Sequence, residues 1–323
     1  MRTATPSNTG KTVIPPTVRC SPSAPRSPWW PRLLVDHLPP GTPGDPGLWG
    51  PGSEVWRVWR ERTLLLGGPA AVLLQLSDPL IAAGVAAHSN FRADPLRRLR
   101  AVLDATLTVT FGDQQQAAAA AARVGRIHRR VQGRLPVAVG CFPAGSVYRA
   151  SDPRLALWVH ATLVVVALEV IDQFVSPLTS QQRARYYQES KPFALLFGVS
   201  ERLLPGSYPE FDAYVRRMLR GPELAIQEPA PELAAAVLDG WLRGLPRPSA
   251  CVVRLLTAGL LPERVREGFG LPWGRREQQH YAALRRVLHA TVPCLSPALR
   301  FWPHYHVALK RVAAVPSTVG AGQ

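Results

Sequence analysis

A stretch of small and apolar residues, 114–133, carries one imidazole at a spacing that could serve chemistry. Residues at intervals of three and four share one face of a helix, and here they are Ala117, Ala121, Val124, His128 and Val131. That face is apolar except for His128. An imidazole in this setting is either a core histidine satisfied by a backbone carbonyl or a ligand to something bulky and flat.

A second histidine, His160, lies in the run RLALWVHATLVVVALEVIDQF, which is apolar on every side. Asp152 and Pro153 are helix start signals, as N-cap and first helical residue. Because an all-apolar helix must be surrounded by other helices, we expect His160 to be buried at the centre of the domain.

The sequence gives only weak support for a zinc site or a non-haem iron site. The four cysteines, of which Cys20 lies near the N-terminus, form no CxxC pair and so no zinc motif. Non-haem iron held by two histidines and a carboxylate could use His128, His160 and Asp78, although no spacing requires it.

Other histidines are expected to be solvated. The Glu-x-x-His pair of the sequence, Glu277 and His280, lies on an Arg- and Gln-rich amphipathic stretch, so a di-iron carboxylate bundle is not indicated. His304 and His306 lie in a stretch that also looks exposed. The sequence contains no phosphate-binding glycine loop and no GxSxG nucleophile motif.

An apolar helical chamber with one inward histidine remains. This combination suits a haem held by a single axial His, with the sixth position open for dioxygen. The porphyrin would need an apolar slot, a neutral imidazole and basic residues for its propionates. The chain supplies all three types, as do many helical proteins.

The elements that position these residues are helices throughout. We expect an all-α fold, a single multi-helix globular domain with a buried central helix layer, because no alternating strand pattern or internal repeat is found. The Pro-rich residues 1–47 predict a disordered leader, residues 48–312 the helical domain, and residues 313–323 a frayed tail.

Composition and charge indicate which classes of partner the protein is expected to bind. The net charge is +16, from 38 Lys+Arg and 22 Asp+Glu, in 323 residues. The arginines are spread over most predicted helices, which argues against a nucleic-acid footprint. No signal peptide is visible, and no run offers an uninterrupted membrane span. We expect a cytoplasmic protein with a small hydrophobic substrate, no nucleic-acid partner and no stable membrane insertion.

Four separated motifs resemble one family. They are LLLGGPAAVLLQLSDPLIAAGVAAHSNFRADPLRRLRAVLDATLTVTFGD, ARVGRIHRRVQGR, YRASDPRLALWVHATL and LLTAGLLPERVREGFGLPWG. Over residues 50–312 the chain resembles the MpaB-like oxygenases, which include the rubber oxygenases or latex clearing proteins. The resemblance implies an all-α fold, haem b, and insertion of dioxygen across an isoprenoid carbon–carbon double bond.

The resemblance also implies site residues. The axial ligand of the family corresponds to His128. An Arg-x-x-x-Thr pair beside the haem corresponds to Arg98 and Val102, so the threonine hydroxyl is missing here. The arginine three residues before the axial histidine is replaced by Gly125, and Arg126 is displaced by one residue.

Two further positions fall in family motifs. Asp78 stands where many relatives have histidine before proline; it would be either a pocket carboxylate or, as we favour, the N-cap of the next helix. His160 would order the pocket by hydrogen bonding, with the role of iron ligand as the alternative. The sequence therefore predicts a haem-dependent oxygenase, with two alternatives: a haem- or apolar-ligand-binding protein without turnover, or a basic interaction module.

Overall fold

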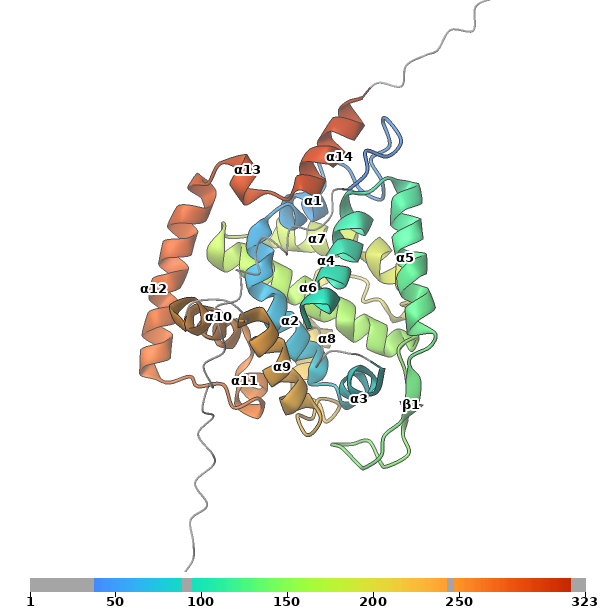
Figure 1. The fold of residues 1–323 in the computed structure, drawn as a ribbon, viewed down its shortest axis with the longest axis vertical. Coiled ribbons are helices and arrows are strands. Elements are labelled where there is room, and N and C mark those ends of the chain that lie inside the picture. The colour runs from blue at the N-terminus through green and yellow to red at the C-terminus, as the bar shows by residue number, and fades with distance from the viewer. Residues whose placement is uncertain (1–37, 89–94, 243–246, 315–323) are drawn as a thin grey trace, which may run out of the picture.

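The protein is helical, as the sequence predicts. The computed structural model describes residues 38–88, 95–242 and 247–314, and within them the helices form one all-α domain (Figure 1). The α-helices are α1 Glu54–Trp59, α2 Gly68–Leu76, α3 Pro79–His88, α4 Pro95–Phe111, α5 Gln114–His128, α6 Pro153–Phe174, α7 Ser180–Leu196, α8 Tyr208–Arg220, α9 Ala230–Leu242, α10 Arg247–Leu260, α11 Glu263–Gly268, α12 Arg275–Thr291, α13 Pro297–Arg300 and α14 Pro303–Ala313. Short 3₁₀ helices span Arg62–Gly67 (η2), Glu201–Leu203 (η4) and Val292–Cys294 (η5).

Helix α6 forms the buried centre of the domain. It contacts η2, α2, α7 and α12, and Figure 1 shows it between the edge helices α5 and α12. Among the described residues it is the one helix long and apolar enough to cross a membrane, and 61% of its most apolar window is buried inside the protein. The segments Arg62–Leu76 and Pro79–His88 would be long and apolar enough only if they formed one span, and they are bent by 105° relative to each other. Burial of this extent is what a core helix requires.

The predicted starts of α5 and α6 are confirmed. Asp113 accepts a hydrogen bond from the Gln116 N–H at 2.8 Å, while the Gln116 side chain accepts from the Asp113 N–H at 3.0 Å. This reciprocal capping box satisfies two backbone donors that would otherwise be unpaired. Asp152 caps α6 in the same position by accepting from the Arg154 N–H. Helix α5 ends at His128, earlier than expected, so Val131 follows the helix rather than extending its stripe.

The expectation that the chain contains no strand is wrong for one hairpin. The strands β1 (Gln132–Arg134) and β2 (Val147–Arg149) pair antiparallel, with Gly133 opposite Tyr148. Three residues are too few to show an alternating pattern. The Tyr148 ring fills the space above Gly133, where an added Cβ would lie 2.4 Å from the phenol oxygen. Tyr148 is buried and anchors the hairpin on α3.

The ordered domain begins earlier than the predicted boundary at residue 48. Leu38 is buried in the main core, and the Thr42 N–H donates to the Asp113 carboxylate at 2.8 Å. The Gly44 N–H donates to the carbonyl of Arg311 at 2.8 Å. Backbone contacts of this kind depend on distant partners and leave no compositional signal, so residues 38–47 were wrongly assigned to the leader. Residues 1–37 and 315–323, the remainder of the predicted leader and most of the predicted tail, lie outside the described residues.

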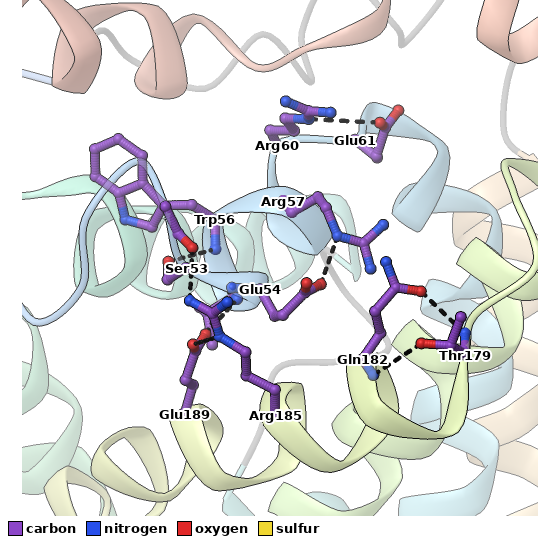
Figure 2. A network of polar contacts seen from close by, with 12 residues as sticks. Ser53, Glu54, Trp56, Arg57, Arg60, Glu61, Thr179, Gln182, Arg185 and Glu189 are labelled. Atoms are coloured by element: carbon purple, nitrogen blue, oxygen red, sulfur yellow. Dashed lines mark hydrogen bonds and ion pairs between the residues drawn. The ribbon is translucent and has the colours of Figure 1, made fainter.

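A polar network ties the first helix to α7 (Figure 2). The Glu189 carboxylate accepts from the backbone N–H groups of Glu54 and Val55, at 2.6 and 3.1 Å. It therefore provides negative charge at the N-terminus of α1, where the helix dipole favours it. Figure 2 also shows the Thr179–Gln182 capping box, which begins α7.

Candidate functional site

An apolar cavity of about 170 Å³ lies between the central helices. Its wall is built by η2, α2, α3, α4, α6 and α9, with the indoles of Trp59 and Trp302. The lining includes Trp59, Leu64, Leu65, Ala71, Val72, Gln75, Val102, Leu103, Thr106, Leu163, Val166, Ala167, Val237, Gly240 and Trp302. Apolar concave sites of this kind are the usual binding sites for hydrophobic small molecules.

Two polar side chains of this cavity are engaged within the protein, whereas the buried Nε1–H of Trp302 has no hydrogen-bond partner among the described residues. The Gln75 amide donates to the Thr162 hydroxyl at 3.1 Å, and the Thr106 hydroxyl donates to the Val102 carbonyl at 2.8 Å. A ligand here would be held by apolar contact rather than by charge. Val102 is 52% exposed and is the most solvent-accessible of the lining side chains, so the cavity comes closest to the surface on the α4 side.

His160 lines a second, much smaller cavity of about 20 Å³. The side chain is buried, as predicted, at 4% exposure. Its Nε2 lies 3.3 Å from the Ser190 hydroxyl, and its ring stacks on Phe193 with centroids 6.3 Å apart. Because Ser190 donates its own proton to the Tyr187 carbonyl at 2.7 Å, the His160 Nε2–H is the donor to Ser190. Burial lowers the pKa of His160 to about 4, so the imidazole is neutral at physiological pH.

The two cavities are neighbours. Trp59 and Leu163 line both of them. Leu163 lies one helical turn after His160 on α6, so the neutral imidazole is separated from the larger cavity by a thin apolar wall. His160 therefore supports this wall through Ser190 and Phe193 without lining the larger cavity itself.

His128 is the last residue of α5 and is half-buried. It is not among the described residues that line either cavity. Arg123 of α5 contacts Asp104 of α4 at 3.0 Å, and since the two helices run antiparallel, His128 comes beside the first turns of α4. The exposed wall residue Val102 lies near the middle of α4, two residues before Asp104, so it points away from the side of α4 that contacts α5.

The helix face that leads to His128 is made of small residues. Ala117 and Ala121 are buried, and Gly125, one turn before His128, has no atom closer than 3.6 Å to the position of an added Cβ. Arg126, Arg129 and Arg130 are exposed around the same helix end. These features fit a porphyrin with an imidazole ligand and guanidinium partners for its carboxylates.

Asp78 caps α3, as favoured from the sequence. Its Oδ1 accepts from the N–H groups of Leu80 and Ile81, at 2.8 and 3.2 Å. The carboxyl is only 3% exposed, and burial raises its pKa to about 6 despite these two hydrogen bonds. Asp78 does not line either cavity, so the cap explains its position and a pocket role has no geometric support.

The remaining sequence predictions have mixed outcomes. Arg98 lies in α4, but its side chain is outside the described residues. His280 is exposed and Glu277 caps α12 through the Gly274 N–H at 2.7 Å, as expected of a solvated face. His304 is 1% exposed, so the expectation that it is solvated is wrong; the residue lies at the start of α14 where that helix packs on α4. Its burial depends on this distant contact.

No cluster of three or more His, Cys, Asp or Glu side chains that could hold a metal ion occurs in the part of the chain that the structure describes. His128, His160 and Asp78 accordingly do not meet as a two-histidine, one-carboxylate site. The cavity walls themselves were not identified from the sequence. In the sequence, nothing distinguishes the lining residues Gln75, Thr106 and Leu163 from ordinary core residues of amphipathic helices.

The fold and site define a class: an all-α protein with a central apolar cavity and a half-buried histidine, His128, at the end of α5. Comparison with known proteins gives the family. Residues 56–290 match the family described as ER-bound oxygenase mpaB/B'/Rubber oxygenase, catalytic domain. The chain belongs to this family and carries its oxygenase-type catalytic domain.

Two relatives from mycobacteria are similar to the chain. These are the uncharacterized proteins Mb2261 of Mycobacterium bovis and Rv2237 of Mycobacterium tuberculosis. Each is 28% identical over 229 residues, which cover 68% of this chain and 86% of the relative. No solved structure matches the chain significantly.

Proposed function

We propose that the protein is a haem b-dependent oxygenase that acts with dioxygen on a hydrophobic, unsaturated, isoprenoid-like substrate. The observation that carries the proposal is the central apolar cavity, whose lining is almost entirely aliphatic and aromatic. Family membership supports the oxygenase class. The haem and the substrate class are what the resemblance to this family implies, and the residues present supply side chains of the types they would need.

His128 is the residue we assign as axial ligand. Its half-buried imidazole follows a helix face that Gly125 leaves bare, and Arg126 is one of the exposed guanidinium groups nearby. When bound, haem b supplies the iron on which dioxygen chemistry depends. The protein would hold the iron through His128 and the propionates through arginine, with Arg98 as a further candidate.

The substrate is assigned to the larger cavity. Its walls are aliphatic and aromatic, and its polar groups Gln75 and Thr106 are engaged internally. Such walls bind by excluding water and by shape, which suits an apolar chain with carbon–carbon double bonds. The same walls would keep water from the reacting atoms.

His160 is assigned a supporting role. Its cavity of about 20 Å³ holds a single water-sized group and is far smaller than a macrocycle. The neutral imidazole donates to Ser190 and packs on Phe193, and these contacts fix the α6–α7 side of the wall through Leu163. Asp78 is assigned to capping α3 rather than to catalysis.

We place the protein in the cytoplasm as part of the proposal. Cys141, Cys251 and Cys294 are exposed free thiols, which suit a reducing compartment. The proposal includes no nucleic-acid partner and no inserted membrane span for the described residues.

The test is oxygen uptake by the haem-supplemented protein in the presence of polyisoprene oligomers or carotenoid-like substrates. The proposal predicts sustained, substrate-dependent uptake with formation of carbonyl products. Uptake that does not depend on substrate, from protein that contains stoichiometric haem, would contradict it. A saturated hydrocarbon of matched length is the control, because it would fill the same cavity without a double bond.

A second function is favoured by Val102 and Gly125. At these positions the chain lacks the hydroxyl and the guanidinium that the resemblance leads us to expect beside the haem. The second candidate is therefore a haem- or apolar-ligand-binding protein without turnover. Haem binding together with a failure of every unsaturated substrate to stimulate oxygen uptake would select it.

A further inference from the structure

The segment between Asp113 and Asp152 has an unusual charge pattern. Residues 114–151 contain six arginines and no aspartate or glutamate. The protein as a whole has 22 acidic residues among 323, so a stretch of this length without any is a local feature. The segment comprises α5, the β1–β2 hairpin and the loop between the strands.

The exposed side chains of α5 form one face. Arg123 lies three and four residues before Arg126 and Ile127 of α5, Arg130 follows two residues after the end of the helix, and all four side chains are exposed. Arg123 pairs with Asp104. Ile127 is 58% exposed, although an aliphatic side chain of this size is normally buried.

The hairpin continues this surface directly after α5. Strand pairing sets Gln132 opposite Arg149 and Arg134 opposite Val147, and side chains of paired residues lie on the same side of a sheet. All four are exposed, whereas Tyr148 points inward. The outer face of the hairpin is therefore made of two arginines, a glutamine and a valine.

We propose that this surface, the α5–hairpin patch of Ile127, Arg130, Arg134, Val147 and Arg149, docks on an anionic lipid bilayer. Guanidinium groups bind lipid phosphates and carboxylates, while Ile127 and Val147 enter the headgroup region. Val137, at 59% exposure in the loop between the strands, adds a further apolar side chain. The docking is peripheral, because the most apolar helix, α6, is mostly buried in the core.

Lipid fits this patch better than nucleic acid. Proteins that bind single-stranded nucleic acid present aromatic rings on which bases stack. The aromatic residues of the segment, Phe142 and Tyr148, instead pack inward with Leu135 and Ala83 of α3. Exposed aliphatic side chains between the arginines gain nothing from contact with a phosphate backbone. At a membrane interface they are stabilised by burial among the lipid headgroups.

The α5–hairpin patch ends at the loop between β1 and β2. Gly140, in the loop between the strands, packs against Ala225, with an added Cβ only 2.5 Å from the Ala225 Cβ. The connection that holds Ala225 also carries Glu223 and Glu228, so the positive surface ends on this side. The bilayer would therefore meet the outer face of the hairpin and the end of α5.

The test is co-sedimentation of the full chain with phosphatidylcholine vesicles, with and without phosphatidylserine. We expect binding to the anionic vesicles that weakens as salt is raised. The double variant Arg134→Gln/Arg149→Gln removes two arginines from the patch. Each arginine near an anionic surface contributes about 1 kcal/mol, so the partition coefficient should fall about 30-fold.

The matched control is Arg276→Gln/Arg286→Gln, which removes the same charge from the exposed side of α12. It should bind within about twofold of the wild type if the effect is local to the patch. Far-UV circular dichroism establishes that both variants are folded. Equal losses in the two double variants, no binding to anionic vesicles, or displacement from vesicles by RNA at low concentration would each overturn the proposal.

Discussion

Glu61 and Arg300 join the two ends of the domain through a buried, two-point contact. The Glu61 carboxylate accepts from Arg300 Nε and Nη2, both at 2.8 Å, and Glu61 is 2% exposed. Breaking such a pair leaves one charge buried without its partner. We expect Glu61→Gln to lower the free energy of unfolding by about 3 kcal/mol, measured by urea denaturation of the apoprotein.

The exposed pair of Arg123 and Asp104 provides the control for this prediction. Their side chains are 53% and 32% exposed, so solvent screens the attraction. Asp104→Asn should cost less than about 1 kcal/mol. A similar loss in both variants would show that Glu61 and Arg300 stabilise the domain no more than a surface pair.

The buried carboxyl of Asp78 should make stability depend on pH. Its pKa is raised from 3.8 in the unfolded chain to about 6, so the native state binds more protons between these values and stability falls as pH rises. Asp78→Asn keeps an oxygen acceptor for the cap but does not ionise. Between pH 4 and pH 7, the free energy of unfolding of Asp78→Asn should rise by about 3 kcal/mol relative to that of the wild type. A pH-independent difference between the two proteins would contradict the raised pKa.

The opposite dependence is expected of His160. Burial lowers its pKa from 6.5 to about 4, so the unfolded state binds more protons in this range and stability falls as pH is lowered. His160→Gln retains a donor for Ser190 without a titratable ring. The wild type should lose about 3 kcal/mol relative to His160→Gln between pH 7 and pH 4. Parallel stability curves for the two proteins would show that the imidazole ionises normally.

Filling the apolar cavity should block the substrate without removing the haem. Ala71 is buried and lines the cavity of about 170 Å³, and a phenyl ring would occupy most of that space. Ala71→Phe should reduce substrate-dependent oxygen uptake at least about tenfold, because the ring takes space that the substrate needs and a loss of about 1.4 kcal/mol in binding is a factor of ten. Haem content should remain unchanged.

Val287→Phe is the corresponding control, since Val287 is 56% exposed on α12. It should leave both haem content and oxygen uptake at wild-type levels. Unaltered uptake by a folded Ala71→Phe variant would place the substrate outside this cavity.

Much of the fold is predictable from local sequence. The caps at Asp113, Asp152 and Thr179 act on backbone groups within the next three residues, and such short-range signals are visible in any sequence. The burial of His160 follows from an apolar pattern on all sides of one helix. The β1–β2 hairpin, by contrast, is shorter than the pattern that would reveal it.

The candidate site is only partly predictable, because it depends on contacts between distant segments. His128 and Asp78 are prominent as single polar residues in apolar surroundings. Their separation follows from the packing of α3 and α5, which spacing along one helix does not determine. The burial of His304 against α4, and the lining of the cavity by Gln75 and Leu163, likewise arise from tertiary packing.

The absorption spectrum of the haem-supplemented protein tests the central claim, that His128 holds haem iron. The wild type should show a Soret band with stoichiometric haem, and His128→Ala should lose most of it. His280→Ala, on the exposed side of α12, and His160→Ala should retain the band, and imidazole added to His128→Gly should restore it. An undiminished Soret band in folded His128→Ala, or none in the wild type, would contradict the assignment.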